Sequence, residues 1–473
     1  MRKILWVALA SVLAIGLLAG CGSGSMNNPV PPGLQTAQVS VSMTDAPPAG
    51  VTVISFEVSL TGATLNPGNA DLLAGKGPIR IEVKKLETEA AFLSTANVTA
   101  GSYTSLNLTF ANPELTFMNN TGAALAGCAV GAVCEIKPAA GTLTATVNAA
   151  FDVTSGMQTG LLVDVNLASL LSATLGVDFT SSGAVTVQQQ AKKDKGELED
   201  ADDIDGIVKT PANNQFTLQT ADMGSITVSV DSNTSFKDFD GCAAANFSCL
   251  KDGQSIEADL LVMAAGSFLA KKVELHDDVA GAGDDELDGV VFKVDSATQF
   301  ELVVIDELRD VANVSVGDPV TVTLQTTGAG TSFRVDAHGL TIPPSLQGAF
   351  EGATDTSQLT PGQTVQIRKR SMTGGPAPAA ITITTDRVRL RGTRFTATVS
   401  GAPTGANFNV ANLPGLFTSV GVTAIQVQTS SQTNFDNVTG VSGLADGTVV
   451  SLRGLLFKSP TTPVLIADKV RKR

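Results

Sequence analysis

The chain has 473 residues, a formal net charge of −14 and only two histidines. A length of this order predicts two to four domains. Two histidines leave almost no material for a multi-histidine metal centre or a Ser-His-Asp triad, and the acidic balance argues against nucleic acid as the general partner.

The first residues have the pattern of a secretory signal. Arg2 and Lys3 precede an apolar run of about 15 residues, which is shorter than the roughly 20 that a spanning helix needs. The run ends in Leu18-Ala19-Gly20-Cys21, which resembles the lipobox of bacterial lipoproteins. The resemblance implies that residues 1–21 are a signal peptide and that acyl chains on Cys21, palmitate among them, anchor the protein to a membrane. An uncleaved transmembrane anchor is the alternative.

The residues after Cys21 predict where the protein is anchored. Gly22 stands where an inner-membrane retention signal typically has aspartate, so resemblance to enterobacterial lipoproteins implies the outer membrane of the bacterial cell envelope. Residues 22–37 are rich in Gly, Ser, Asn and Pro and are expected to form a flexible tether.

Residues 38–190 are predicted to form the first domain. Apolar and polar residues alternate along 39–43 and 51–60, and a period of two is typical of half-buried strands. Further strands are expected at Ile79–Lys84, Tyr103–Phe110, Glu114–Phe117, Gly141–Val153, Leu161–Asn166 and Ala184–Gln189, with helical turns at Glu87–Leu93 and Leu167–Ser172. These elements together predict an antiparallel β-sandwich.

Two motifs in this domain carry a resemblance. They are Val41-Ser42-Met43-Thr44-Asp45-Ala46-Pro47 and Ala100-Gly101-Ser102-Tyr103-Thr104-Ser105-Leu106. Both resemble domain-of-unknown-function family 4382, whose members are bacterial lipoproteins. The resemblance implies a sandwich related to immunoglobulin or transthyretin-like folds, and it implies no activity.

Acidic stretches at 191–204 and 279–287 are predicted to be solvated linkers. Each leads into a similar start, Asp205-Gly206-Ile207-Val208 and Asp288-Gly289-Val290-Val291. Charge is uneven around them, because residues 192–310 carry 26 acidic against 10 basic residues, whereas residues 311–473 carry 8 against 14.

Three units with one skeleton follow, at 205–278, 288–391 and 392–473, the second with insertions. Each has a Thr-x-Phe element, a Leu-x-x-Gly turn and a closing strand. The threonines are Thr234, Thr331 and Thr433, and the turn glycines are Gly253, Gly362 and Gly447. The pattern predicts small antiparallel barrels, in which closure removes exposed edges. The units resemble domain-of-unknown-function family 5666, which has no known catalytic residues to transfer.

Four cysteines remain once Cys21 is assigned to the anchor. Their spacing predicts local disulfides, Cys128 with Cys134 and Cys242 with Cys249, each adding about 2 kcal/mol by closing a short loop. A zinc site is the rival interpretation, but neither pair has the two-residue spacing or a nearby histidine.

Two charged patterns suggest ligands. Asp284, Glu286, Asp288 and Asp295 mimic the spacing of an EF-hand calcium loop, although residues 290–294 have the pattern of a strand. A solvated acidic linker that keeps two barrels apart is the interpretation we favour. The second pattern is a basic stretch, which fits either an anionic partner or the polar outer face of a sheet; it comprises Arg368, Lys369, Arg370, Arg387, Arg389, Arg391 and Arg394.

The sequence therefore predicts an all-β envelope lipoprotein, a sandwich followed by about three barrels. We expect a non-catalytic binding, spacing or scaffolding role, with no catalytic residues and no cofactor. The expected partners are the membrane, through lipid on Cys21, and an unidentified envelope protein or polysaccharide, but not nucleic acid. The alternatives are a carboxylate-dependent hydrolase of envelope polymers and a calcium-rigidified surface adhesin.

Overall fold

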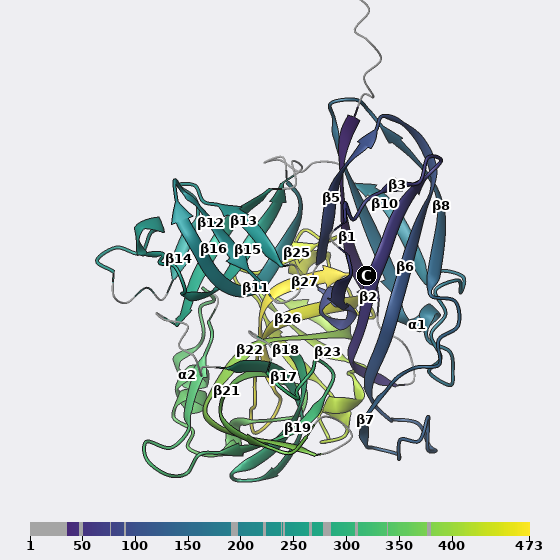
Figure 1. Cartoon of the computed structure of the whole chain (residues 1–473). Helices are drawn as coiled ribbons and strands as arrows, with labels where there is room; N and C mark the ends of the chain where they lie inside the picture. Colours follow the sequence, from purple (N-terminus) through teal and green to yellow (C-terminus); the bar gives the residue numbers. More distant parts are fainter. Residues whose placement is uncertain are drawn as a thin grey trace, which may run out of the picture.

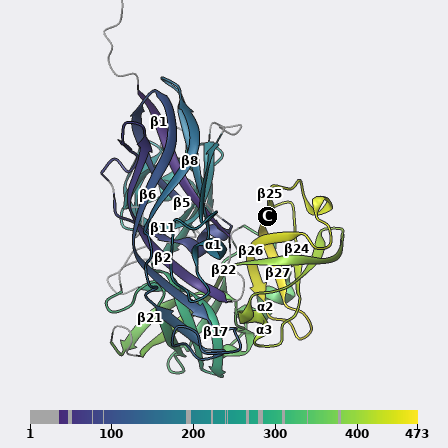
Figure 2. The ribbon, with the colours of Figure 1, turned by 90° about the vertical axis from the view of Figure 1, so that its right-hand side faces the viewer.

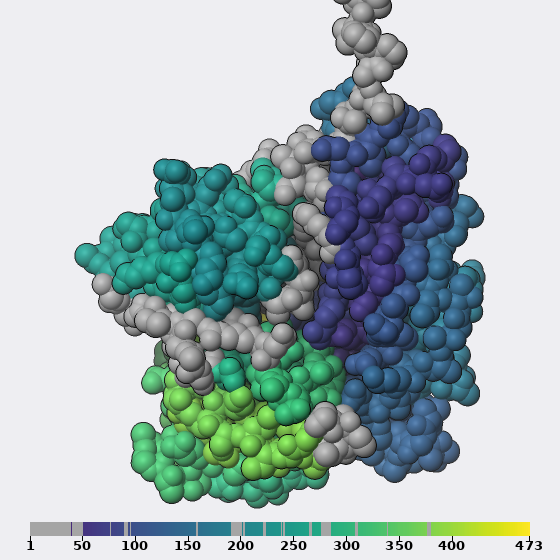
Figure 3. Space-filling view, in the orientation of Figure 1, coloured from purple at the N-terminus to yellow at the C-terminus, as the bar shows by residue number. Residues whose placement is uncertain are grey.

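The computed structural model describes residues 36–46, 51–75, 77–88, 91–190, 197–220, 224–237, 239, 242–263, 267–277, 285–307, 311–337, 339–375 and 380–473. They are mostly strands, which confirms the predicted all-β class. The N-terminal sandwich, purple to blue, packs beside three small barrels (Figures 1 and 2). The space-filling view shows the sandwich beside barrels 1 and 2 (Figure 3). Within the described ranges, no helix is both long and apolar enough to cross a membrane.

Two sheets form the sandwich. One has the order β10-β9-β1-β5 and the other contains β3-β2-β6-β7, with β4 on β2 and β8 on β6. The first comprises β1 (Thr36–Ala46), β5 (Ala91–Thr99), β9 (Gln158–Asn166) and β10 (Val185–Gln190). The second comprises β2 (Thr52–Asn66), β3 (Ala70–Asp71), β4 (Ile79–Glu82), β6 (Gly101–Met118), β7 (Val133–Ile136) and β8 (Thr144–Val153). Pairing is antiparallel except between β1 and β9, which run parallel.

One apolar core lies between these sheets. Alternate residues of β6 point into it, among them Leu106, Leu108 and Phe110. The Phe110 ring stacks on Phe179 at a centroid distance of 4.0 Å. Because every second residue of a strand faces this core, apolar and polar residues alternate along the sequence of the domain.

The structure corrects two predicted elements of the sandwich. The expected helical turn at Glu87–Leu93 is wrong, because a 3-10 helix η1 (Val83–Glu87) ends where that turn was to begin and β5 starts at Ala91. Pairing with β1 overrides the local preference for a helix, and it buries Leu93, Ala96 and Val98. The two strands expected at 103–110 and 114–117 are a single strand, β6. The turn at Leu167–Ser172 is confirmed by α1 (Leu167–Leu170).

The three barrels share one connectivity. Barrel 1 contains β11 (Glu197–Ala212), β12 (Gln215–Gln219), β13 (Ser225–Ser229), β14 (Ser235–Lys237), the 3-10 helix η2 (Phe247–Cys249), β15 (Ser255–Met263) and β16 (Phe268–Asp277). Barrel 2 contains β17 (Glu286–Ser296), β18 (Gln299–Glu307), β19 (Pro319–Leu324), β20 (Ser332–Val335), α2 (Pro344–Glu351), the 3-10 helix η3 (Thr356–Gln358), β21 (Thr364–Thr373) and β22 (Ile381–Thr404). Barrel 3 continues along β22 with β23 (Asn407–Ala411), α3 (Gly415–Thr418), β24 (Ile425–Gln428), β25 (Asn434–Asp436), the 3-10 helix η4 (Val441–Gly443), β26 (Val449–Phe457) and β27 (Val464–Lys472).

Each barrel closes through the same parallel contact. Its third strand pairs with its last strand, as β13 with β16, β19 with β22, and β24 with β27. The main strands of each barrel therefore form a five-stranded ring of OB-fold type. The repeat predicted from the sequence is a repeat of this ring.

The repeated residues serve the same purpose in each barrel. The threonine of each Thr-x-Phe element donates from Oγ1 to a carbonyl of the last strand: Thr234 to Ala270 at 2.7 Å, Thr331 to Thr385 at 2.9 Å and Thr433 to Ala467 at 2.7 Å. The turn glycines all have φ between 80° and 93°, which is why glycine recurs there.

The predicted linkers and boundaries need adjustment. Residues 197–204 belong to β11 and pair with β15, so the second half of the predicted linker 191–204 is a strand. In the second predicted linker, Glu286 and Leu287 already belong to β17. The predicted boundary at 391 and 392 lies inside β22, a continuous strand that ends barrel 2 and begins barrel 3.

Gly289 lies where the first two strands of barrel 2, β17 and β18, approach each other closely. A Cβ there would stand 2.8 Å from the carbonyl oxygen of Val303 and would also clash with Leu302. We expect Gly289→Ala to destabilise the protein by about 1–3 kcal/mol through overpacking, measured as a lower melting temperature by calorimetry. Gly101→Ala is the matched control, because nothing lies within 4 Å of its Cβ position. Equal melting temperatures for the two variants would contradict this interpretation.

Candidate functional site

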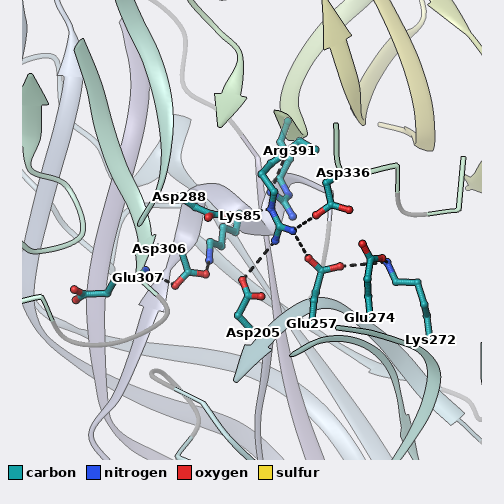
Figure 4. Close-up of polar contacts among 12 residues, drawn as sticks. Lys85, Asp205, Glu257, Lys272, Glu274, Asp288, Asp306, Glu307, Asp336 and Arg391 are labelled. Carbon is teal, nitrogen blue, oxygen red and sulfur yellow. Dashed lines mark hydrogen bonds and ion pairs between the residues drawn. The ribbon is translucent and has the colours of Figure 1, made fainter. Parts of the chain in front are cut away.

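Arg391 is the centre of a buried polar network between barrels 1 and 2 (Figure 4). Its side chain is 5% exposed. Nη1 lies 2.5 Å from Glu257 Oε2 and 2.5 Å from Asp336 Oδ2. Nε lies 3.1 Å from Asp288 Oδ2, and Nη2 lies 3.5 Å from Asp205 Oδ2. One guanidinium therefore binds two carboxylates from barrel 1 and two from barrel 2.

The repeat places two of these acids. Asp205 and Asp288 have the same position in barrels 1 and 2, one residue before the glycines Gly206 and Gly289. Asp205 is the register partner of Glu257 across β11 and β15, so both barrel 1 carboxylates stand side by side. The antiparallel pairing of β11 with β15 thus places Asp205 and Glu257 side by side, next to Arg391.

A second cation extends the network into barrel 1. Nζ of Lys272 lies 3.2 Å from Glu257 Oε1, 3.2 Å from Glu274 Oε2 and 3.5 Å from Asp259 Oδ2. Figure 4 shows Glu257, Glu274 and Lys272 next to one another below Arg391. The carboxylates outnumber the two cations, so protons must neutralise part of the cluster.

Burial determines the protonation of this network. It raises the pKa of Asp205 well above the usual value, although Arg391 opposes the shift. Burial and then Asp336 raise the pKa of Glu274 to about 8. Burial disfavours the charge on Arg391, but Glu257 and the other acids raise its pKa well above normal, so the guanidinium stays charged.

The sandwich is joined to the barrels by separate contacts. Lys85 of η1 forms an ion pair with Asp306 of β18 (Figure 4). Thr116 Oγ1 donates to the Gly317 carbonyl at 2.6 Å. Arg473 Nη2 of barrel 3 donates to the Glu87 carbonyl at 2.7 Å. These bonds tie the sandwich to barrels 2 and 3.

Two carboxyl groups also face each other between the sandwich and barrel 2. Burial and then Asp318 raise the pKa of Glu135, on β7, to about 7. Burial likewise raises the pKa of Asp318, which lies just before β19. A proton shared by the pair removes the repulsion that two carboxylates would cause.

A cavity of about 490 Å³ lies where the sandwich, barrel 2 and barrel 3 meet. The 3-10 helix η1 supplies Lys84, Lys85 and Glu87 to its wall, and β22 supplies Arg394. The remainder of the wall is partly apolar, with Ile54, Ile305, Leu416 and Phe417 among its residues.

The disulfide predictions are confirmed. Cys128 is bonded to Cys134 and Cys242 to Cys249. The predicted lipidation site, Cys21, lies outside the described residues.

The calcium candidates do not form one site. Glu286 pairs with Arg387, Asp288 with Arg391 and Asp295 with Lys293, while Asp284 lies outside the described residues. An extended strand separates residues that an EF-hand loop would curl around one ion. Among the residues that the structure describes, no group of three or more His, Cys, Asp or Glu side chains is placed to hold a metal.

The basic stretch does not form one uniform face, because Arg370 is exposed whereas Arg391 is not. Arg368 and Arg370 both bind Asp386, and Lys369 pairs with Asp285. Arg391 is buried. No local pattern of the sequence predicts that Arg391 joins two barrels. The opposite net charges of residues 192–310 and 311–473 do indicate that these regions attract each other.

Removing the hub should destabilise the protein strongly. We expect Arg391→Met to cost about 3–5 kcal/mol, because it leaves Glu257 and Asp336 buried without their cation. Calorimetry measures the change as a lower melting temperature.

The matched control is Arg370→Met, which removes an arginine whose side chain is 39% exposed and should cost about 1 kcal/mol or less. Adding Glu257→Gln to Arg391→Met should recover part of the loss. A hub variant as stable as the control would contradict the assignment.

The raised carboxyl pKa values predict lower stability at higher pH. The folded protein keeps a proton on Glu274 up to about pH 8, whereas the ordinary pKa is 4.5, so stability is lost as pH rises between these values. We expect Glu274→Gln to flatten the fall of melting temperature between pH 5 and pH 9. The exposed Glu351→Gln control should retain the wild-type slope. A wild-type slope in both variants would refute the shift.

Comparison with known proteins supports two of the domains. Residues 36–193 match the family model described as "Domain of unknown function (DUF4382)", and residues 205–274 match "Domain of unknown function (DUF5666)". The search of curated proteins found no match. Among solved structures, one described as "drosophila Unr CSD456" matches 58% of this chain and 98% of its own length, at 10% identity and a TM-score of 0.13. The chain thus joins a domain similar to family DUF4382 to a barrel similar to family DUF5666, in the order that the sequence predicted.

Proposed function

We propose that the chain is a non-catalytic scaffold or spacer of the bacterial envelope, lipid-anchored through Cys21, whose sandwich and barrels hold a fixed arrangement. The observation that carries the proposal is the Arg391 network, which joins barrels 1 and 2 through a buried guanidinium. Such a junction tolerates little sliding, because any displacement would leave a buried charge without its partner.

Contacts between the other domains support a fixed arrangement. Thr52 Oγ1 of the sandwich accepts from the Gly415 amide of barrel 3 at 2.7 Å. Gln432 Oε1 of barrel 3 accepts from the Thr341 amide of barrel 2 at 2.8 Å. The first bond joins residues 363 positions apart and the second joins residues 91 positions apart. A protein built this way presents the surfaces of its sandwich and barrels at fixed distances from one another.

The outer face of barrel 1 supports a role without nucleic acid. OB-folds bind single strands on their second and third strands, commonly with aromatic platforms for the bases. Here β12 and β13 expose uncharged polar side chains instead, among them Gln215, Gln219, Ser225 and Thr227.

The hydrolase alternative has one feature in its favour, since Glu82 and Glu87 line the same cavity. Burial raises the pKa of Glu82 to about 7, in the range of a general acid. However, its carboxylate accepts hydrogen bonds from Ser55 Oγ and from the amides of Phe56 and Lys84. Glu87 is fully buried. Neither group is presented to a substrate, so we favour the scaffold.

The anchor is tested by Cys21→Ala in the full chain expressed in a Gram-negative host. We expect the wild type to incorporate labelled palmitate and to fractionate with the outer membrane, because acyl chains on Cys21 hold it there. The variant should lose the label and the fractionation, whereas Ser23→Ala should retain both. A labelled Cys21→Ala protein would refute the anchor.

The same strains test the scaffold. Chemical crosslinking should recover a specific envelope protein or polysaccharide with the wild type and less of it with Arg391→Met, at a temperature where both remain folded. Unchanged recovery from Arg391→Met would contradict a role for the fixed arrangement.

A further inference from the structure

The cavity between the sandwich, barrel 2 and barrel 3 has a divided wall. One part is apolar, formed by Ile54, Ile305, Leu416 and Phe417 from three different domains. The other part is charged, formed by η1 of the sandwich and by Arg394 of β22. Its volume of about 490 Å³ is in the range of small-molecule sites. A ligand that fits this wall has an apolar body and a charged end.

The exposure of the charged side chains in the wall indicates whether the charged end of the ligand is an anion or a cation. The side chains of Lys84 and Lys85 are 18% and 22% exposed, and Arg394 is partly exposed. Glu87, which pairs with Lys84, has no exposed surface. Glu82, the other acid of the wall, is 9% exposed, and its oxygens accept hydrogen bonds from Ser55 and from the amides of Phe56 and Lys84. The cations are therefore more exposed than the carboxylates, and ammonium and guanidinium groups are what a ligand meets.

The cations are held in place before any ligand arrives. Lys84 pairs with Glu87, and Lys85 pairs with Asp306 of barrel 2 (Figure 4). Arg394 Nη1 donates to the Gly392 carbonyl at 3.4 Å. Preorganised donors lose little conformational freedom on binding, and each charge-assisted hydrogen bond to an anion is stronger than a neutral one.

We propose that this cavity binds an amphipathic anion, an alkyl chain that ends in a carboxylate or a phosphate. Lys84, Lys85 and Arg394 hold the anionic head, and the chain lies against Ile54, Ile305 and Leu416. The ligand contacts the sandwich, barrel 2 and barrel 3 at once, so its binding strengthens their association. A free fatty acid and a lysophospholipid-like alkyl phosphate share this chemistry.

Calorimetric titration of residues 22–473, which contain every described residue, tests the site. Dodecanoate and dodecyl phosphate, below their critical micelle concentrations, are the probes, and the preference between them distinguishes the two sources of the anion. We expect saturable binding of at least one probe and a rise in melting temperature, because the ligand binds only the folded state. Dodecanol and dodecyltrimethylammonium should bind at least about ten-fold more weakly, since each lacks the anion.

Two variants assign the binding to this cavity. Arg394→Gln should weaken binding of the preferred probe by about ten-fold or more, through loss of a charged hydrogen-bond donor. Arg389→Gln, five residues earlier on the same strand and outside the cavity wall, should bind within about two-fold of wild type. Leu416→Asp, which places a carboxylate against the alkyl chain, should abolish binding. Absence of binding by both probes, tight binding of the cationic surfactant, or an unchanged affinity in Arg394→Gln would each overturn the proposal.

Discussion

The charge on Arg391 is the constraint on which the arrangement of the barrels depends. Removing a guanidinium from water is expensive, and the interior recovers that cost only when carboxylates surround the group with good geometry. Two carboxylates from each barrel do so here. Apolar residues of similar size would join the barrels with comparable stability, but they would tolerate sliding. The buried network instead requires one relative position, because each acid must reach the same cation.

The described parts of the two acidic stretches, residues 197–204 and 285–287, belong to or adjoin the strands that carry this network. Residues 197–204 are the first part of β11, and Asp205 of the same strand pairs with Arg391. Glu286 of the second stretch and Asp288, which follows it, pair with arginines of β22. Excess carboxylates around these contacts are neutralised by protons, as the pKa of Glu274 near 8 indicates. The raised pKa values of Glu274, Glu135 and Asp318 place pH-sensitive groups at the interfaces between domains.

The region after the sandwich consists of three similar five-stranded rings, and one strand, β22, is shared by the second and third. Each five-stranded ring closes through a parallel pair of its third and last strands, and its threonine bond to the last strand recurs three times. Because β22 runs through two rings, barrels 2 and 3 share one rigid element rather than a linker. Among the described strands none is common to barrels 1 and 2, and the ionic hub links these two barrels instead.

Local patterns of the sequence determined the fold class, the two disulfides and the repeat, because alternation, cysteine spacing and turn glycines act over a few residues. They also predicted where most strands lie, from the sandwich to the last barrel. Only the tertiary structure decided that Glu87–Leu93 is not a helix, that Arg391 is buried rather than displayed, and that Glu286 and Asp288 serve arginines instead of one metal ion. The tertiary structure also forms the cavity, because its wall combines Lys84, Ile305 and Leu416 from three different domains. These features depend on contacts between residues up to hundreds of positions apart, and no local pattern encodes which distant side chain will neutralise a given charge.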